Sequence, residues 1–196
     1  MQSKCADSVA AARSLFPAGR GGSIPTSALN LRFSKCNSKR AARLNQLWHS
    51  KQPIIGAVNT LNPCFVASFD GEFYAVAIWS NPVARELPQK TWLELRRFAI
   101  APDRPHNTAS RMLAWMVKEI HRSRPHVAKL ISYQDADEHT GTIYRAAGWK
   151  PVYLSKSGGA WSNRQRRNRT ARRRKNKVRW ELSLILRSKV RMQNAK

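Results

Sequence analysis

Strand-like and helix-like patterns alternate along the chain, and this alternation is the feature that most constrains its fold. Asp70-Gly71 lies between two apolar runs, Cys64–Phe69 and Glu72–Ser80, which is typical of a β-hairpin with a two-residue turn. Further strands are expected at residues 28–34, 91–100, 127–133, 149–155 and 178–186. Helices are expected from an N-cap at Asn37 or Ser38 to near His49, at residues 108–123, and at residues 140–148, where Gly148 ends the helix. The order predicts an α/β (α+β) domain with a mixed, mostly antiparallel sheet and helices on its faces.

Length and charge narrow the class of protein. A chain of 196 residues can bury one good core, so we expect a single domain. The net charge of +25, from 36 Lys and Arg against 11 Asp and Glu, predicts a polyanionic partner, with DNA or RNA ahead of an anionic membrane. No apolar run is long enough to cross a bilayer, so a soluble protein is expected. The three cysteines are scattered, which favours a reducing cytosol over a disulfide framework.

The ends of the chain and one internal segment differ in composition from the rest. Residues 1–26 are expected to be a loosely ordered leader, residues 27–187 the folded domain, and residues 188–196 a basic tail. The run 164–179 holds ten basic residues and no acid, and we interpret it as an arm or long loop between two paired strands that lies along a phosphate backbone. The candidate DNA-binding residues are Arg164, Arg166, Arg167, Arg169, Arg172, Arg173, Arg174, Lys175 and Lys177.

The stretch "RPHNTAS" connects a predicted strand to a predicted helix and is spaced like a phosphate-binding loop without its glycines. A helix N-terminus offers backbone amides and a positive dipole end, here from Asn107 to Ser110, and Arg104 adds charge. Asn107 is the best non-glycine residue for a left-handed turn, and Ala109 is small enough for close approach. The alternative is that Asn107 or Thr108 only caps the helix.

Three acids, Asp135, Asp137 and Glu138, follow the predicted strand 127–133 within four residues. Ligand sites of α/β folds gather at such strand ends. Asp137 and Glu138 are explained as well by a solvated turn before a helix. Asp135 is therefore the candidate catalytic carboxylate.

Several ordered motifs together resemble a known family. "LELRRFAI", a turn reading R-x-x-N-T-A and "IYRAAGW" are similar to the pattern of the GNAT acetyltransferases. With "LWHSK", "SYQDADEHTGTIY" and the later basic run, the stretch from Phe33 to Trp180 resembles the Mom proteins of Mu-like phages, GNAT-fold enzymes that modify adenines in DNA.

The resemblance implies acetyl-CoA as cofactor and assigns roles to particular residues. Phe98, Ala99 and Ile100 would form the strand edge that receives the pantetheine arm, and Arg104, Asn107, Thr108, Ala109 and Ser110 would hold the pyrophosphate. Asp135 would take a proton from the adenine amino group or orient it, and Tyr144 would protonate the departing thiolate, with a half-buried aromatic as the alternative.

The resemblance also raises the question of iron. His49 matches the family's His-Tyr motif, but Ser50 stands where the tyrosine is common, which leaves the metal open. His49 and Asp135 are the candidate iron ligands, His49 is a candidate catalytic residue, and His139 is an alternative ligand.

The expected product is methylcarbamoyl-adenine, made in double-stranded DNA with the adenine extruded and protecting phage DNA from restriction. Trp48, Trp149 and Trp161 are candidates for stacking on bases, with core packing favoured for Trp149. The expected location is the cytoplasm of the infected bacterium, and the oligomeric state stays open. Two alternatives remain, an ordinary N-acetyltransferase acting on RNA or protein and a non-enzymatic nucleic-acid-binding protein.

Overall fold

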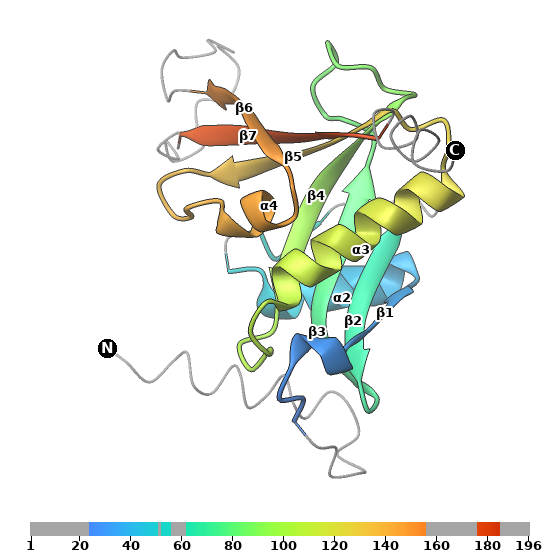
Figure 1. Ribbon diagram of the computed structural model, residues 1–196, viewed down its shortest axis with the longest axis vertical. Helices are drawn as coiled ribbons and strands as arrows, with labels where there is room; N and C mark the ends of the chain where they lie inside the picture. The colour runs from blue at the N-terminus through green and yellow to red at the C-terminus, as the bar shows by residue number, and fades with distance from the viewer. Residues whose placement is uncertain (1–23, 51, 56–61, 156–175, 185–196) are drawn as a thin grey trace, which may run out of the picture. The chain divides into compact units, whose positions relative to one another are not determined.

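The computed structural model describes residues 24–50, 52–55, 62–155 and 176–184. Seven strands form one sheet in the order β1-β2-β3-β4-β5-β7-β6, and the chain between them forms helices (Figure 1). The mixed, mostly antiparallel sheet confirms the predicted fold class. The strands are β1 (Arg32–Lys35), β2 (Cys64–Phe69), β3 (Glu72–Ser80), β4 (Trp92–Ile100), β5 (Lys129–Asp135), β6 (Lys150–Ser155) and β7 (Lys177–Ser183). The helices are the short η1 (Ala28–Asn30), α2 (Ser38–Trp48), α3 (Thr108–Ser123) and α4 (Thr142–Ala146).

The chain divides into two compact parts. The first comprises the residues up to Ala77 together with Phe98–Thr108, and the second comprises Ile78–Arg97 together with the residues from Ala109 onward. Within the described residues, no helix combines the length and apolar character needed to span a membrane.

The first part begins differently from the prediction. The strand expected at residues 28–34 is wrong at its start, because the Ser27 hydroxyl accepts a hydrogen bond from the Leu29 amide (3.2 Å) and caps the turn η1. Strand β1 therefore begins at Arg32 and pairs antiparallel with β2. Of the two predicted N-caps of α2, the structure has Asn37, whose side chain accepts a hydrogen bond from the Arg40 amide (2.8 Å).

The predicted hairpin is confirmed by its backbone. Asp70 and Gly71 have φ values of 49° and 84°, and two successive positive φ angles define the type I′ turn that joins neighbouring antiparallel strands. At the other end of β2, the Cys36 amide donates to the Cys64 carbonyl (2.9 Å) and so continues the β1–β2 ladder. Cys36 and Cys64 are free thiols.

In the second part, helix α3 has the predicted bounds. Its side chains Met112, Met116 and Ile120 are fully buried, and the Trp79 indole of β3 donates to the Met116 sulfur (3.3 Å). Trp115, expected on the same face, is half-buried.

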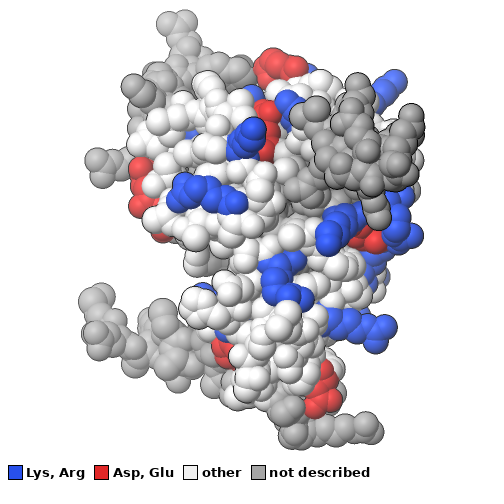
Figure 2. Space-filling view, in the orientation of Figure 1, with Lys and Arg blue, Asp and Glu red and all other residues white. Residues whose placement is uncertain are grey.

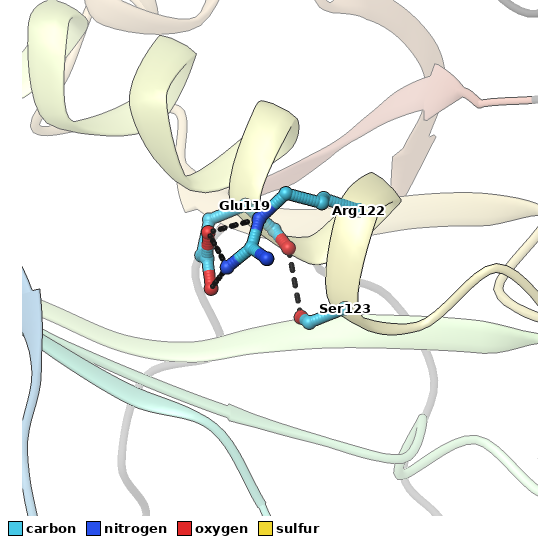
Figure 3. A network of polar contacts seen from close by, with 3 residues as sticks. All are labelled: Glu119, Arg122 and Ser123. Atoms are coloured by element: carbon cyan, nitrogen blue, oxygen red, sulfur yellow. Dashed lines mark hydrogen bonds and ion pairs between the residues drawn. The ribbon is translucent and has the colours of Figure 1, made fainter.

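The last turns of α3 carry a local polar network. The Arg122 guanidinium binds both carboxylate oxygens of Glu119, and the Ser123 hydroxyl donates to the Glu119 carbonyl (2.7 Å; Figure 3). Because the Arg122 side chain is 75% exposed, this ion pair stabilises the helix only weakly.

Strands β5, β7 and β6 complete the second part. Strand β5 pairs parallel with β4 and antiparallel with β7, and β7 pairs antiparallel with β6. This pairing confirms that the basic run joins two paired strands. The expected strand 127–133 is displaced, because pairing with β7 extends β5 to Asp135 and leaves residues 127 and 128 before it. Lys177 and Arg179, at the end of the basic run, belong to β7.

Candidate active site

The turn between β4 and α3 has the backbone that its sequence requires. Asn107 adopts φ = 64°, which confirms the expected left-handed conformation at the residue before the helix. The Thr108 hydroxyl donates to the Pro105 carbonyl (2.7 Å), and Thr108 is buried. The Thr108 amide donates to the same carbonyl (3.4 Å), so both donors of Thr108 close the turn from within. The geometry supports both a capping role and anion binding.

The residues around this turn divide into buried and exposed groups. Ala109 is 9% exposed, which fits the expectation of a small residue at a close approach. Arg104 is exposed, and its guanidinium donates to the Pro102 carbonyl (3.1 Å), which holds the guanidinium against the loop. A guanidinium has five N–H donors, so this one bond leaves capacity for a phosphate. The turn therefore places a cation near the N-terminus of α3, where anions are favoured.

Strand β4 changes its pairing along its length. Its register with β5 runs from Trp92↔Lys129 to Leu95↔Ser132, while both strands continue past these pairs. Phe98 and Ile100 are half-buried and Ala99 is buried. Backbone groups of an extended strand that leave a ladder can bind an extended ligand by strand addition, which suits the expected role of this segment.

Tyr144 of α4 lies in an aromatic and polar cluster of the second part. It is 7% exposed, its ring stacks on Trp180 (5.2 Å between centroids, 14°), and Trp149 meets its edge (5.7 Å, 66°). The hydroxyls of Tyr144 and Ser132 are 2.8 Å apart. Burial raises the pKa of Tyr144, and the hydrogen bond from Ser132 opposes this only in part. At neutral pH the phenol is protonated, as a proton donor must be, and its hydroxyl reaches the β5 strand through Ser132.

The polar residues that hold this cluster, Ser132 and Gln134, were not predicted from the sequence. Gln134 accepts a hydrogen bond from the Trp180 indole (2.6 Å) and donates to the His139 carbonyl. Gly141 has φ = 75° and packs directly against this cluster. A Cβ added to Gly141 would be 2.2 Å from Trp180 Cζ2 and 2.6 Å from Gln134 Oε1. Ser132 and Gln134 alternate with the other side chains of β5, and this alternation of buried polar residues is the signal that could have revealed them.

Asp135 was expected to follow the strand 127–133, but it is the last residue of β5. It lies opposite Lys177 of β7, is half-buried, and accepts a hydrogen bond from the Asp137 amide at Oδ1 (3.2 Å). The Asn176 side chain donates to Asp137 (3.2 Å), whereas Glu138 and His139 are exposed. Amide donors thus offset repulsion within the acid cluster, and Asp135 is its most enclosed carboxylate.

His49 ends helix α2 as its C-cap. Its Nδ1 accepts a hydrogen bond from the Gln52 amide (3.2 Å), which gives the ring a local structural role. Among the described residues, no group of three or more His, Cys, Asp or Glu side chains is placed to hold a metal ion. The structure therefore gives no support for iron at His49, Asp135 or His139.

The structure describes some of the residues that were predicted to contact DNA and not others. Trp149 is buried against Trp79 (6.3 Å between centroids) and so belongs to the core, whereas Trp48 is half-buried. Lys177 is exposed on β7. Trp161 and the predicted DNA-binding residues from Arg164 to Lys175 lie outside the described residues, as do most of the leader and the tail. On the face shown in Figure 2, Lys and Arg side chains spread widely and Asp and Glu occur in fewer places.

Comparison with solved structures identifies the fold. The chain resembles the ribosomal-protein-S18-alanine N-acetyltransferase of Escherichia coli at 16% identity and a TM-score of 0.55, covering 79% of this chain and 94% of that one. YncA of Salmonella typhimurium, solved with its cofactor acetyl-CoA, matches at 11% identity and 0.57 over 79% and 94%. An acetyltransferase of Bacillus subtilis in complex with CoA matches at 10% identity and 0.54 over 79% and 97%. At these identities the likeness establishes the GNAT fold.

Comparison with sequences identifies the family. A search of curated proteins gave no match. The model of the Mom protein family matches residues 71–196, which is more than half of the chain and includes the β4–α3 turn, the Asp135 strand end and α4. Family and fold together support a function of the acyltransferase type. The chain belongs to the Mom protein family.

Proposed function

We propose that this protein is a DNA-modifying enzyme that uses acetyl-CoA to convert adenine at N6 to methylcarbamoyl-adenine. The observation that carries the proposal is the left-handed Asn107 at the head of α3, because a phosphate-binding turn without glycine requires such a residue and this one lies in the region matched by the Mom family. Such a modification would protect phage DNA from restriction in the cytoplasm of the infected host.

The residues of the chain suit transfer of the acetyl group to the adenine amino group; the additional NH of the methylcarbamoyl product requires a separate nitrogen donor and a rearrangement. Bound acetyl-CoA supplies a thioester carbonyl that is open to attack by an amine. The β4–α3 turn and Arg104 neutralise the pyrophosphate of the coenzyme. The Asp135 carboxylate accepts a proton from the attacking amino group. Tyr144 is kept protonated by its surroundings and can return a proton to the thiolate that leaves, with Ser132 orienting its hydroxyl.

Net charge argues for nucleic acid as the substrate. A charge of +25 far exceeds what an enzyme of small amines needs, and it favours a nucleic acid over a protein as the substrate, while the Mom family match supports DNA over RNA. Acetyl and methylcarbamoyl groups differ by one NH, so the mass of the modified nucleoside separates the two reactions.

Nucleoside mass spectrometry of DNA from cells that express the protein is the direct test. We expect methylcarbamoyl-deoxyadenosine with the wild type and its loss with Asp135→Ala. Arg104→Ala should lower the yield through weaker coenzyme binding. Acetylated RNA or protein with unmodified DNA would establish the first alternative, and DNA binding without any modified adenine would establish the non-enzymatic one.

A further inference from the structure

A continuous row of side-chain contacts crosses four strands on one face of the second part. Lys129 Nζ lies 4.2 Å from the centre of the Trp92 ring and 2.7 Å from Glu181 Oε2. Arg179 Nε lies 2.9 Å from Glu181 Oε1, and Arg179 Cζ lies 5.6 Å from the centre of the Tyr153 ring. Glu181 thus holds two cations, and each cation lies against an aromatic ring.

The same face carries Asp135. Residues opposite each other in neighbouring strands point to the same side of a sheet, and the register pairs Tyr133 with Arg179 and Asp135 with Lys177. Two residues along a strand span roughly 7 Å, so Asp135 and Lys177 lie about one such step from Arg179. The row of contacts therefore lies beside the candidate catalytic carboxylate.

Exposure and charge indicate what this face could bind. Tyr153 is 56% exposed, Lys177 is exposed, and Lys150, which pairs with Glu181 in the register, is exposed as well. With Arg96 and Glu94, which lie on the same side of β4 as Trp92, five cations share the face with three carboxylates, which leaves an excess of positive charge. An exposed aromatic ring beside fixed cations suits a base next to a phosphate.

Building on the proposed function, we propose that this face docks an unpaired stretch of a DNA strand and guides its adenine to Asp135. Arg179 and Lys177 lie beside the phosphates, and a base stacks on Tyr153. Bases of an intact duplex are already stacked on each other, so the surface suits the strand around an extruded adenine. Glu181 fixes the direction of the Arg179 side chain and so positions a phosphate contact.

The first test compares Tyr153 with its neighbour. A fluorescein-labelled single-stranded DNA oligonucleotide is titrated with the full-length protein while anisotropy is recorded. Tyr153→Ala should weaken binding roughly 10-fold, since stacking on one ring contributes about 5- to 150-fold in affinity. Tyr153→Phe should bind like the wild type. Leu154→Ala is the matched control, because Leu154 is 50% exposed on the same strand and alternation points it to the other face.

The second test uses salt. Repeating the titration over a series of NaCl concentrations with Arg179→Gln should reduce the slope of log affinity against log salt by about one phosphate contact. Glu181 keeps Lys129 as its partner in this variant, so folding is expected to be retained. Thermal unfolding of each variant verifies this.

The outcomes test the proposed docking surface independently of the proposed adenine modification. If Tyr153→Ala and Arg179→Gln bind single-stranded DNA as the wild type does, the docking surface is refuted, even where the wild type modifies adenine. If both variants bind more weakly while the wild type modifies no adenine, the surface stands and the proposed reaction fails. A wild type that binds no DNA refutes both.

Discussion

The packing around Gly141 allows a prediction of stability with a matched control. A Cβ at residue 141 would lie 2.2 Å from Trp180 Cζ2, far inside van der Waals contact, and the backbone has φ = 75°. Overpacking costs about 1–3 kcal/mol, and a left-handed backbone costs a residue with a side chain about 1–2 kcal/mol. Gly141→Ala should therefore lower the free energy of unfolding by about 2–5 kcal/mol. Gly71→Ala has a similar backbone, φ = 84°, but its Cβ would meet nothing within 4 Å, so only the smaller backbone cost applies.

Urea unfolding of both variants measures the two contributions. The difference between Gly141→Ala and Gly71→Ala measures crowding against Trp180 and Gln134 together. Trp180→Phe removes the crowded ring atoms, so the double variant Gly141→Ala with Trp180→Phe should be more stable than the sum of the single effects predicts. Equal free energies of unfolding for Gly141→Ala and Gly71→Ala would show that the contact with Trp180 is relieved without cost and would refute the reasoning.

Three other predictions follow from single features. Asn107→Gly should retain coenzyme A affinity, measured by calorimetry, whereas Asn107→Val should weaken it about 10-fold because a β-branched residue resists positive φ. Burial raises the pKa of Cys36 from 9.0 to about 12 and that of Cys64 from 9.0 to about 11, so the folded state keeps these protons at a pH where the unfolded chain loses them. The free energy of unfolding should therefore fall as the pH rises above 9, and it should fall less in Cys36→Ala. Glu181→Gln should destabilise by about 1–3 kcal/mol because two half-buried cations lose their carboxylate, against less than about 1 kcal/mol for Arg122→Gln, whose side chain is 75% exposed, in the same urea assay.

Much of the fold could be predicted because strong local signals set it. Helix α3 has the predicted bounds, since its apolar period continues from Thr108 to Ser123 and Pro125 follows. The hairpin at Asp70-Gly71 was predictable because few residues tolerate two positive φ angles in succession. The ends of β5 were not, since the pairing partner and not the local sequence decides where a strand stops.

The candidate site was predictable to a smaller extent. The left-handed Asn107 follows from the chemistry of one residue, so sequence was sufficient. The Ser132–Tyr144 and Gln134–Trp180 hydrogen bonds join residues 12 and 46 positions apart, and no local pattern specifies such pairs. His49 was proposed by resemblance, and its bond to the Gln52 amide depends on how the chain leaves α2.

The side chains on the two faces of strand β5 have different roles. Ser132 and Gln134 point to one face, where they hold Tyr144 and Trp180 in a buried cluster. Tyr133 and Asp135 point to the other face, beside the cations of β7. The ladder with β7 fixes this alternation, since a shift of one residue would exchange the two faces and bury Asp135 among the aromatic rings.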